Sequence, residues 1–443
     1  MSEQSAQRVR LAVAVVGVVL LWLVLCSSAL ALDTSMRSVA DIRQHWSALK
    51  PTYAGSPYSS APHTLAPYAA GSLAPGFLLD GLDAINYARY LAGMPDDVAL
   101  DDQLTGLAQH GAVLLAASEF SHTPSQPAGM DDAFYQAGYS ATSSSNIGAG
   151  YESLWEFNVG CMDDSDPSNI DRLGHRRWLL FPALAKTGMG YANERTDTYV
   201  FDWSRVEPVD YAAVLWPCAG YFPVQMFSAG TAWSITLNPD QYVIGDGAYT
   251  VSLRRIGDGR IWTFTSADTD PSGKYFNVDT QGFGVDNCFI FRPDPASVGS
   301  YRVGDVFEVT LSGGVYLADG VTPATISYRT EFMSQETVLP AATVTRPYAP
   351  ASVRRRKMFS AWGYLMPLHA AGTRAVTLYC SRRVGSAWKV RKTVTATVGD
   401  YSTYSRYSVR LSLPSAGRWR IRGYHADAEH RPSYSAWRYL VVR

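Results

Sequence analysis

The spacing of apolar residues divides the chain into a helical first part and a strand-rich second part. Apolar side chains recur at helical spacing over residues 77–91 and 101–118, which predicts two amphipathic helices packed on a core. Asp101 or Asp102 stands where the N-cap of the second helix is expected. Further helices are expected over residues 40–49, 151–162 and 168–173, and two facing strands over 187–193 and 198–203.

Two segments of the helical part lack a periodic pattern. Residues 51–75 are rich in Ser, Pro, Ala and Tyr, and we expect residues 32–75 to form an extended arm or linker beside the next domain. Residues 119–150 are rich in Ser, Gly, Pro and Asn, which predicts a long loop. Long loops are often functional, so this segment is a place to look for site residues.

Beyond residue 216 the pattern alternates, as in strands with one buried face. Gly and Pro interrupt it at short intervals, which predicts a β-sandwich over residues 214–340 and, after a linker with three prolines, a second over 350–443. Strands are expected over 231–237, 248–256, 260–265, 288–291, 306–311 and 325–332, and then over 359–365, 375–381, 388–398, 404–413, 417–424 and 437–442.

The N-terminus has the pattern of an export signal. Arg8 and Arg10 precede an uncharged apolar run, residues 11–25, and Ala29–Leu30–Ala31 offers a small-x-small cleavage site. Residues 1–31 are therefore expected to be a signal peptide, with an uncleaved membrane anchor as the alternative, because residues 11–32 are long enough to span a bilayer. Either reading places the protein outside the cell or at its surface.

Composition and charge narrow the picture. The 443 residues are 47% hydrophobic and 17% charged, which excludes a globally disordered chain and suits several domains. The net charge of −1 hides an asymmetry, because residues 350–443 hold about 18 Lys and Arg against 3 Asp and Glu. Because nucleic acid is not the partner of an exported protein, this basic module is expected to bind an anionic cell-wall polymer or surface. The alternative is an ordinary solvated sandwich face.

Five cysteines lie far apart and show no CxxC spacing. Cys26 would leave with the signal peptide, and the other four allow three disulfide pairings in an oxidising compartment. Four buried thiols are an equally good interpretation. The four are Cys161, Cys218, Cys288 and Cys380.

Candidate chemistry gathers between residues 86 and 203. His122 follows the second predicted helix, and His175 stands in the run Gly174–His175–Arg176. Asn146 and Asp164 lie between them in the sequence. A histidine in a loop is more often a surface residue than a functional one. The ordered set as a whole is the informative signal, and it also includes Asn86-x-x-Arg89, Ser121-His122-x-Pro124, Gly138–Tyr139–Ser140, Ser145–Asn146–Ile147 and Gly188-x-Gly190-Tyr191.

This order resembles the bacterial branch of the CAP superfamily, whose SCP-like domain is an α-β-α sandwich. The resemblance covers residues 76–205, less than a third of the chain. It implies that His122 and His175 meet in a surface cleft that binds a small ligand or peptide. It also implies a multidomain fold in which the CAP domain is followed by β-sandwich domains. Residues 404–407, 417–420 and 425–427 more weakly resemble an Ig-like C-terminal module of wall-associated bacterial proteins.

Two imidazoles within about 3–5 Å of each other could share a divalent metal such as zinc, with a carboxylate or water completing the shell. His122 and His175 are the expected ligands, and Asp164 is the nearby acid. The chain departs from the family at Ser145, which stands where many members have a glutamate. A hydroxyl is no ionised acceptor, which weakens the case for tight metal binding and for hydrolysis.

The expected ligand-binding residues are His122, His175, Ser145, Asn146, Asp164 and Arg176. Arg176 suits an anionic group of the ligand, and an ion pair that stabilises the fold is the equal alternative. For Asn146 a structural role is favoured over ligand binding, because asparagine holds loops through side-chain to backbone hydrogen bonds. No nucleophile elbow, phosphate-binding loop, dinucleotide fingerprint or His-Glu-x-x-His motif occurs in the sequence.

The leading hypothesis is a secreted or cell-surface CAP-domain protein that binds a ligand between two histidines and is held at the wall by its β-modules. One alternative is a metal-assisted hydrolase of peptide or wall polymer, so whether the protein is an enzyme stays open. The other is a structural or adhesive surface protein. The sequence does not identify the ligand or the oligomeric state.

Overall fold

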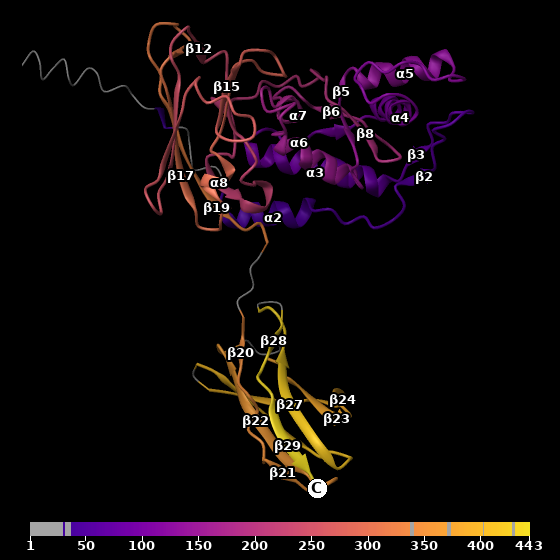
Figure 1. Ribbon diagram of the computed structural model, residues 1–443, viewed down its shortest axis with the longest axis vertical. Coiled ribbons are helices and arrows are strands. Elements are labelled where there is room, and N and C mark those ends of the chain that lie inside the picture. The colour runs from indigo at the N-terminus through magenta and orange to yellow at the C-terminus, as the bar shows by residue number, and fades with distance from the viewer. Residues whose placement is uncertain (1–29, 32–36, 337–340, 370–373, 402, 428–429) are drawn as a thin grey trace, which may run out of the picture. The chain divides into compact units, whose positions relative to one another are not determined.

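The computed structural model describes residues 30–31, 37–336, 341–369, 374–401, 403–427 and 430–443. They divide into two compact units, residues 1–336 and 337–443 (Figure 1). The predicted signal segment, residues 1–31, lies outside the described residues except for Leu30–Ala31, which form the short strand β1. Within the described ranges, no helix is long and apolar enough to cross a membrane.

The two long predicted helices form with the expected caps. Helix α3 (Pro75–Ala92) starts with a proline in its first turn and ends at Gly93, whose φ of 77° suits glycine. Helix α4 (Asp102–Ala117) begins after Asp101, whose carboxylate accepts hydrogen bonds from the N–H groups of Gln103 and Leu104. Helix α2 (Val39–Leu49) is also close to its predicted range and begins with a capping box at Ser38.

The long loop expected over residues 119–150 is wrong in its second half. Helix α5 (Asp132–Thr142) begins after the N-cap Asp131 and is followed by strand β5 (Ser145–Ala149). Gly138 lets α5 lie close to α4, because an added Cβ there would stand 3.0 Å from the carbonyl oxygen of His110. The small residues that looked like loop composition are the contact surface between two helices.

Helices cover both faces of a small antiparallel sheet. Its strands run in the order β5, β8 (Arg195–Tyr199) and β7 (Met189–Ala192). On one face Gly190 lies against the backbone of α4, and on the other Gly148 lies against Phe157 of α6. Helix α6 (Leu154–Asp163) packs on α3. The helix expected over residues 168–173 is wrong, because that segment forms turns and the short helix α7 (Gly174–Leu179) begins only after it.

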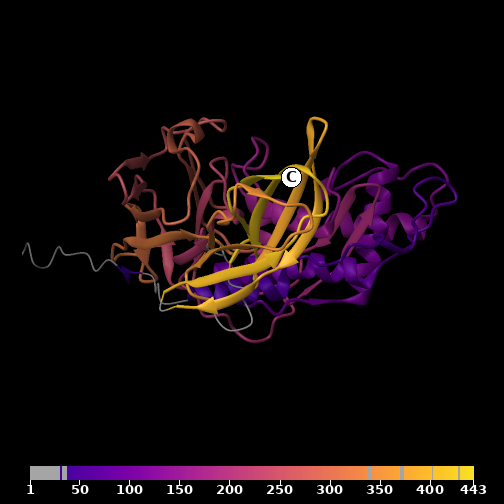
Figure 2. The same cartoon turned by 90° about the horizontal axis from the view of Figure 1, so that it is seen from below.

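The strand-rich half of the first unit is joined to the helical half, as Figure 1 and Figure 2 show. One buried core runs from Ile42 to Met333 and includes Phe157 of α6 and Trp233 of the strand-rich half. The boundary expected between domains 76–205 and 214–340 therefore does not separate two compact bodies. Arg177 contributes to the joint, because its guanidinium donates to the carboxylate of Asp279 and to two carbonyl oxygens in the strand-rich half.

Two larger sheets make up that half. One is a six-stranded sheet in which β1, β19 (Ile326–Met333), β17 (Val306–Ser312), β13 (Thr250–Arg255) and β14 (Ile261–Phe264) follow in order and β10 (Gly220–Pro223) pairs with β19. The other contains β15 (Tyr275–Asp279), β16 (Cys288–Arg292), β11 (Trp233–Leu237) and β9 (Ala213–Trp216). The remaining elements of the unit are β2 (Tyr58–Ser60), β3 (Ser72–Leu73), β4 (Ala99–Leu100), β6 (Lys186–Thr187), β12 (Tyr242–Ile244), β18 (Val315–Leu317), α8 (Pro295–Val298) and the 3₁₀ turn η1 (Val224–Met226).

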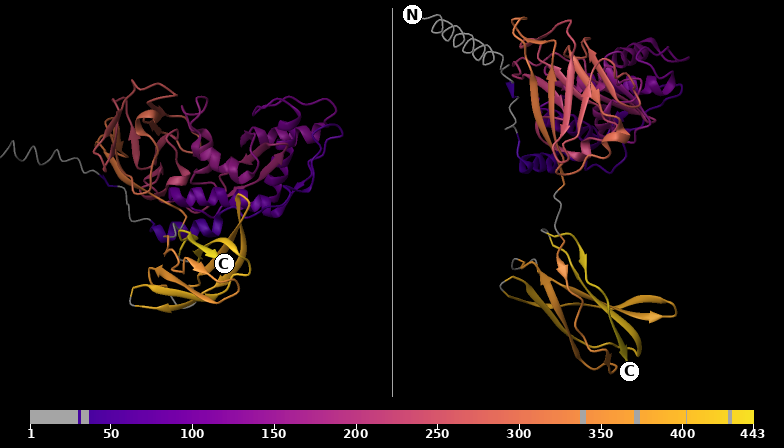
Figure 3. Two further views of the ribbon diagram at one scale, coloured as in Figure 1. Left: turned by 60° about the horizontal axis from the view of Figure 1, so that its bottom comes forward. Right: turned by 60° about the vertical axis from the view of Figure 1, so that its left-hand side comes forward.

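The second unit consists of two sheets around one core (Figure 3). The first contains β20 (Thr343–Val344), β22 (Phe359–Met366), β26 (Ser405–Leu411) and β25 (Thr397–Asp400). The second contains β21 (Ser352–Val353), β29 (Arg438–Val442), β27 (Gly417–His425), β23 (Thr377–Val384) and β24 (Ala387–Thr395), with β28 (Ser433–Tyr434) paired to β27. Alternate residues of β27, such as Trp419 and Ile421, fill the core, as the period-two pattern predicts.

The four cysteines of the described ranges are buried free thiols, so the disulfide alternative is wrong. Burial raises the pKa of Cys218 to about 11 and that of Cys380 to about 12. Thiols held in this state are poor nucleophiles. They act as small apolar side chains.

Candidate functional site

The two predicted histidines line the same cavities, although 52 positions separate them in the chain. His122 lies in the loop after α4, and His175 lies in the first turn of α7. Both line a cavity of about 550 Å³ and an adjoining one of about 260 Å³. The two histidines therefore border one hollow of the surface, and ligand binding there stays a prediction.

Asp164 orients the ring of His175. Its carboxylate accepts hydrogen bonds from Nδ1 of His175 at 2.7 Å and from the backbone N–H groups of His175 and Arg176 at 2.9 and 3.3 Å. Asp164 ends α6 in the left-handed region, with φ of 47°, a conformation that aspartate tolerates better than most residues. The bend at the end of α6 thus brings a buried carboxylate under the start of α7.

This pairing favours the charged form of His175. Burial disfavours the imidazolium, but the hydrogen bond and the negative charge of Asp164 outweigh it and raise the pKa of His175 above its usual 6.5. A proton on Nδ1 faces Asp164, so the neutral ring carries its lone pair on Nε2.

His122 is oriented by a different acceptor. Its Nδ1 donates to the carbonyl oxygen of Thr142 at 2.8 Å, while the Thr142 hydroxyl donates back to the carbonyl of His122 at 3.1 Å. The carbonyl acceptor fixes the Nδ1–H tautomer, so His122 also keeps its lone pair on Nε2. The end of α5 therefore holds this loop in place.

The donor set of the cleft is too small for a tightly held zinc ion. Two Nε2 atoms suit zinc, but zinc in proteins is almost always four-coordinate with three or four protein ligands. Across the described ranges, no third Cys, His, Asp or Glu joins His122 and His175 in a metal-binding group. Metal binding in the cleft stays a prediction.

Asn146 and Ser145 lie on β5 at the wall of the smaller cavity. The Asn146 amide donates to the carbonyl oxygen of His175 at 2.9 Å and so fixes the start of α7. Ser145 is buried close to Asp197 of β8, which is fully buried. Burial raises the pKa of Asp197 well above its usual range, with the Ser145 hydroxyl opposing that shift. Burial therefore favours the neutral form of the carboxyl group that lies close to Ser145.

The prediction that Arg176 binds a ligand is wrong. Its side chain is 1% exposed and donates to the carbonyl oxygens of Met162, Asp163 and Ala232 and to the hydroxyl of Ser234. Burial lowers its pKa to about 10. The guanidinium satisfies the last carbonyls of α6 and joins them to β11, which is a structural role.

The remaining lining gives the larger cavity an acidic character. It includes Asp163, Asp164 and Asp166, and no lysine or arginine. Partial burial acts to raise the pKa of Asp166, but hydrogen bonds from Ser168 and Asn169 outweigh it, and the pKa is lowered. The rim carboxylate Asp166 is therefore charged at neutral pH. Aromatic lining comes from Phe120, Tyr151 and Phe157 in the larger cavity and from Trp178, Phe201 and Phe283 in the smaller.

The strand-rich half supplies part of the wall, which the sequence did not indicate. Phe283, in the connection between β15 and β16, lines the smaller cavity. An added Cβ on Gly174 would stand 3.0 Å from the Phe283 ring, so glycine at this position lets the two halves of the unit meet. The cleft is built by both halves of the first unit.

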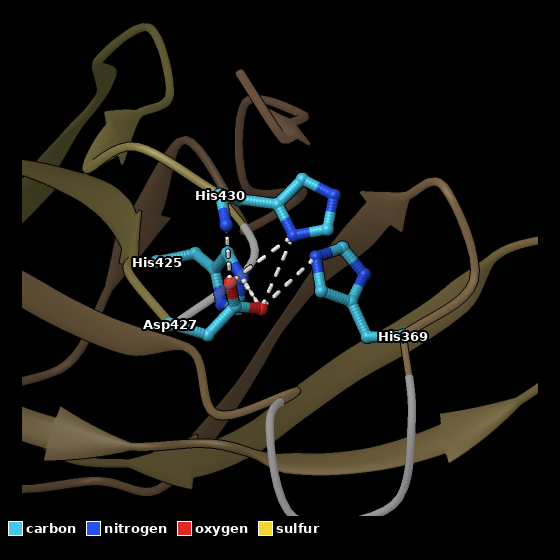
Figure 4. A group of neighbouring side chains, drawn as sticks. All are labelled: His369, His425, Asp427 and His430. Carbon is cyan, nitrogen blue, oxygen red and sulfur yellow. Dashed lines mark hydrogen bonds and ion pairs between the residues drawn. The ribbon is translucent and has the colours of Figure 1, made fainter. Parts of the chain in front are cut away.

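A second group of titratable side chains was missed. Among the described residues, the one group of three or more potential metal ligands lies in the second unit, at His369, His425, Asp427 and His430 (Figure 4). The spacing His425-x-Asp427-x-x-His430 was a usable signal, because one turn connection supplies three donors. The fourth donor comes from a different connection.

Comparison with known proteins supports the assignment of the cleft-bearing segment. Residues 82–206 match the family model described as CAP, the cysteine-rich secretory protein family. No curated protein matches the chain. Among solved structures, a chimeric titin Z1Z2–Z1Z2 tandem carrying a GRGDS peptide from fibronectin matches with 11% identity over 48% of this chain and 90% of that chain. Its TM-score of 0.15 is too low to indicate a shared fold. The family match thus supports the CAP superfamily for residues 82–206.

Proposed function

We propose that the protein is an exported CAP-domain protein whose cleft binds a polar ligand that carries a positive charge. The observation that carries this proposal is the lining of the 550 Å³ cavity, in which aspartates accompany His122 and His175 and neither lysine nor arginine occurs. A cationic or hydrogen-bond-donating group complements such a lining. The occurrence of CAP domains in secreted proteins supports export.

The ligand class that fits is an amine-bearing peptide, such as a stem peptide of the bacterial wall. Asp163 and Asp166 are exposed at the rim and can pair with an ammonium group. Aromatic side chains beside them offer apolar contact to the rest of the ligand. The anionic ligand expected from Arg176 is not supported, because that guanidinium is occupied inside the fold.

The test uses a lysine-containing stem peptide and the same peptide with its amine acetylated. Isothermal titration should show binding of the first and at least about tenfold weaker binding of the second, which corresponds to about 1.4 kcal/mol. Asp166→Asn should weaken the first peptide's binding and leave the acetylated peptide unchanged. His110→Ala is the matched control, because His110 lies on α4 in the same unit and outside the cavity lining. The proposal is contradicted if the protein binds both peptides equally well or binds neither of them.

A hydrolase is the second candidate, and the Asp164–His175 pair favours it. A carboxylate bonded to Nδ1 is the arrangement that orients an imidazole as a general base toward water. The Ser165 hydroxyl donates a hydrogen bond to the carbonyl oxygen of Asp163, and the Ser168 hydroxyl donates one to the carboxylate of Asp166. Burial raises the pKa of the Cys161 thiol. None of these three groups is therefore an activated nucleophile. A hydrolase of this kind would have to activate water. Release of peptide or sugar fragments from purified wall polymer, lost in His175→Ala, would support it.

For the second unit we propose association with an anionic wall polymer. Arg420 lies over the rings of Trp388 and Trp437, at 4.7 and 3.9 Å from the ring centroids, and Arg422 lies over Tyr434 and Trp437 at 4.0 and 4.5 Å. The stacking fixes the guanidinium planes on the face of β27 opposite its core residues. Fixed cations beside aromatic rings suit a polymer with acidic groups.

A further inference from the structure

The four potential donors of the second unit come from two connections that belong to opposite sheets. His369 follows β22 of the first sheet. His425 ends β27 of the second sheet, and Asp427 and His430 lie in the turn that leads to β28. The second unit has three histidines, and all three lie in this group, which we name the His₃Asp cluster. The rings are turned toward the Asp427 carboxylate (Figure 4).

The cluster is buried. The side chains of His369 and His425 are 0% exposed, that of Asp427 is 4% exposed and that of His430 is 8% exposed. A carboxylate out of water needs a compensating charge or a full set of hydrogen bonds. Three imidazoles contact the Asp427 carboxylate, and the backbone N–H of His430 donates to it at 2.6 Å.

Two of the rings are held in one tautomer by carbonyl groups. Nδ1 of His369 donates to the carbonyl oxygen of Pro367 at 2.6 Å, and Nδ1 of His425 donates to that of Ala375 at 2.8 Å. Each neutral ring then presents the lone pair of Nε2 to the cluster. This carbonyl–imidazole arrangement is the one that supports a metal-bound histidine from behind.

The Nε2 lone pairs of His369 and His425 therefore face a carboxylate oxygen of Asp427. Nε2 of His425 lies 3.0 Å from Oδ2 of Asp427, and Nε2 of His369 lies 3.5 Å from the same oxygen. Nε2 of His369 is buried and has no hydrogen-bond partner among the described residues. Electron-rich atoms at these distances repel unless a cation lies between them.

We propose that the His₃Asp cluster binds one zinc ion through Nε2 of His369, Nε2 of His425, Nδ1 of His430 and the carboxylate of Asp427. These atoms lie within 4.8 Å of one another. Bonds of about 2.0–2.1 Å in a tetrahedron set the ligand atoms about 3.3 Å apart. The recorded separations of 3.0, 3.1 and 3.5 Å from Asp427 to the three rings are close to that value.

Four protein ligands close the coordination shell, so the ion has a structural role and no open position for substrate. It ties the connection after β22 to the turn between β27 and β28, and so fastens the two sheets at one end of the unit. Arg431, next to His430, forms a parallel bridge with Ala341, which also belongs to that end. We expect zinc to stabilise the second unit and to leave the first unit unchanged.

The test measures zinc bound by the purified full chain after equilibrium dialysis, with cobalt as a spectroscopic substitute. Wild type should bind zinc in the cluster at one equivalent, and its cobalt form should show the intense visible bands of tetrahedral coordination. His425→Gln and His369→Gln should each weaken this binding by more than about 100-fold, because losing even a supporting partner costs 10–100-fold. The two variants change different connections, so a folding defect in one does not decide the outcome.

The matched control is the double variant His122→Ala with His175→Ala, which removes the cleft histidines and leaves the cluster intact. This variant should still bind one equivalent of zinc and show the visible bands of its cobalt form. The proposal would be overturned if wild-type protein bound no zinc, or if only the cleft variant lost the bound zinc. The charge of Asp427 would then be balanced by protons on the histidines alone.

Discussion

The chain contains two groups of histidines that differ in exposure and in the number of donors. The cleft of the first unit brings together His122 and His175, opens to a cavity of about 550 Å³ and has acidic residues at its rim. The His₃Asp cluster of the second unit is closed, buried and has four donors. An open pair suits a ligand that enters and leaves, whereas a closed set suits a resident ion. Donor number and exposure, more than residue type, separate the two roles.

The largest expected effect concerns the first unit's Arg176. Arg176→Ala removes the donor to three buried carbonyl groups and to Ser234, and should lower the free energy of unfolding by about 3–5 kcal/mol. Urea unfolding measures this loss. Arg254→Ala, which breaks an exposed pair with Glu308, should change stability by less than about 0.5 kcal/mol. A stable Arg176→Ala protein with weakened ligand binding would restore the ligand-binding role that the structure argues against.

Chelation should separate the two units. With free zinc at about a hundred times its dissociation constant, the bound ion adds about 2.7 kcal/mol to the stability of the second unit. Calorimetry with and without a chelator should therefore shift one transition and leave the transition of residues 37–336 in place. If the chelator shifted both unfolding transitions together, or shifted neither, the distinction between an open and a closed site would be contradicted.

Much of the first unit could be predicted from the sequence, because its helices are long and their apolar stripes are regular. Helix α5 could not, since Gly138 and Ala141 gave it the composition of a loop while serving as its packing surface. The joint between the two halves was also missed. Arg177 and Phe283 make that joint from segments about 100 residues apart, which no local pattern records.

The candidate site divides in the same way. The family order pointed to His122 and His175, which line the same cavity although they lie far apart in sequence. Arg176 was misassigned because the sequence does not show whether an arginine next to a site histidine points outward or into the fold. His369 was missed because its partners lie more than 50 residues away, and nothing in its own segment marks it as a ligand.

The raised pKa of His175 predicts a pH-dependent contribution to stability in the open site. Because the folded pKa lies above the usual 6.5, the contribution is fully present below that pH and is lost as the pH rises through the folded value. Unfolding midpoints measured at a series of pH values above 6.5 should therefore fall more steeply in wild type than in His175→Gln. Asp164→Asn should also flatten the curve, since it removes the partner that raises the pKa. Parallel curves for all three proteins would contradict the assigned pairing.

The smallest effect is expected on the outer face of the second unit. Arg420→Gln should weaken retention on an anionic polymer about fivefold at low salt, since a basic residue near an anionic surface contributes about 1 kcal/mol. Added salt should reduce the difference by screening. Retention on lipoteichoic acid resin measures this, with Arg254→Gln of the first unit as the control. Binding that is insensitive to salt and to Arg420 would favour a solvated face without a polymer partner.

Anomalous diffraction at the zinc absorption edge, from crystals of the full chain grown with zinc, tests the division between the two sites most directly. We expect a strong peak among His369, His425, Asp427 and His430 whose height survives washing in zinc-free buffer. A chain without a peak there, or with its persistent peak between His122 and His175, would contradict this expectation.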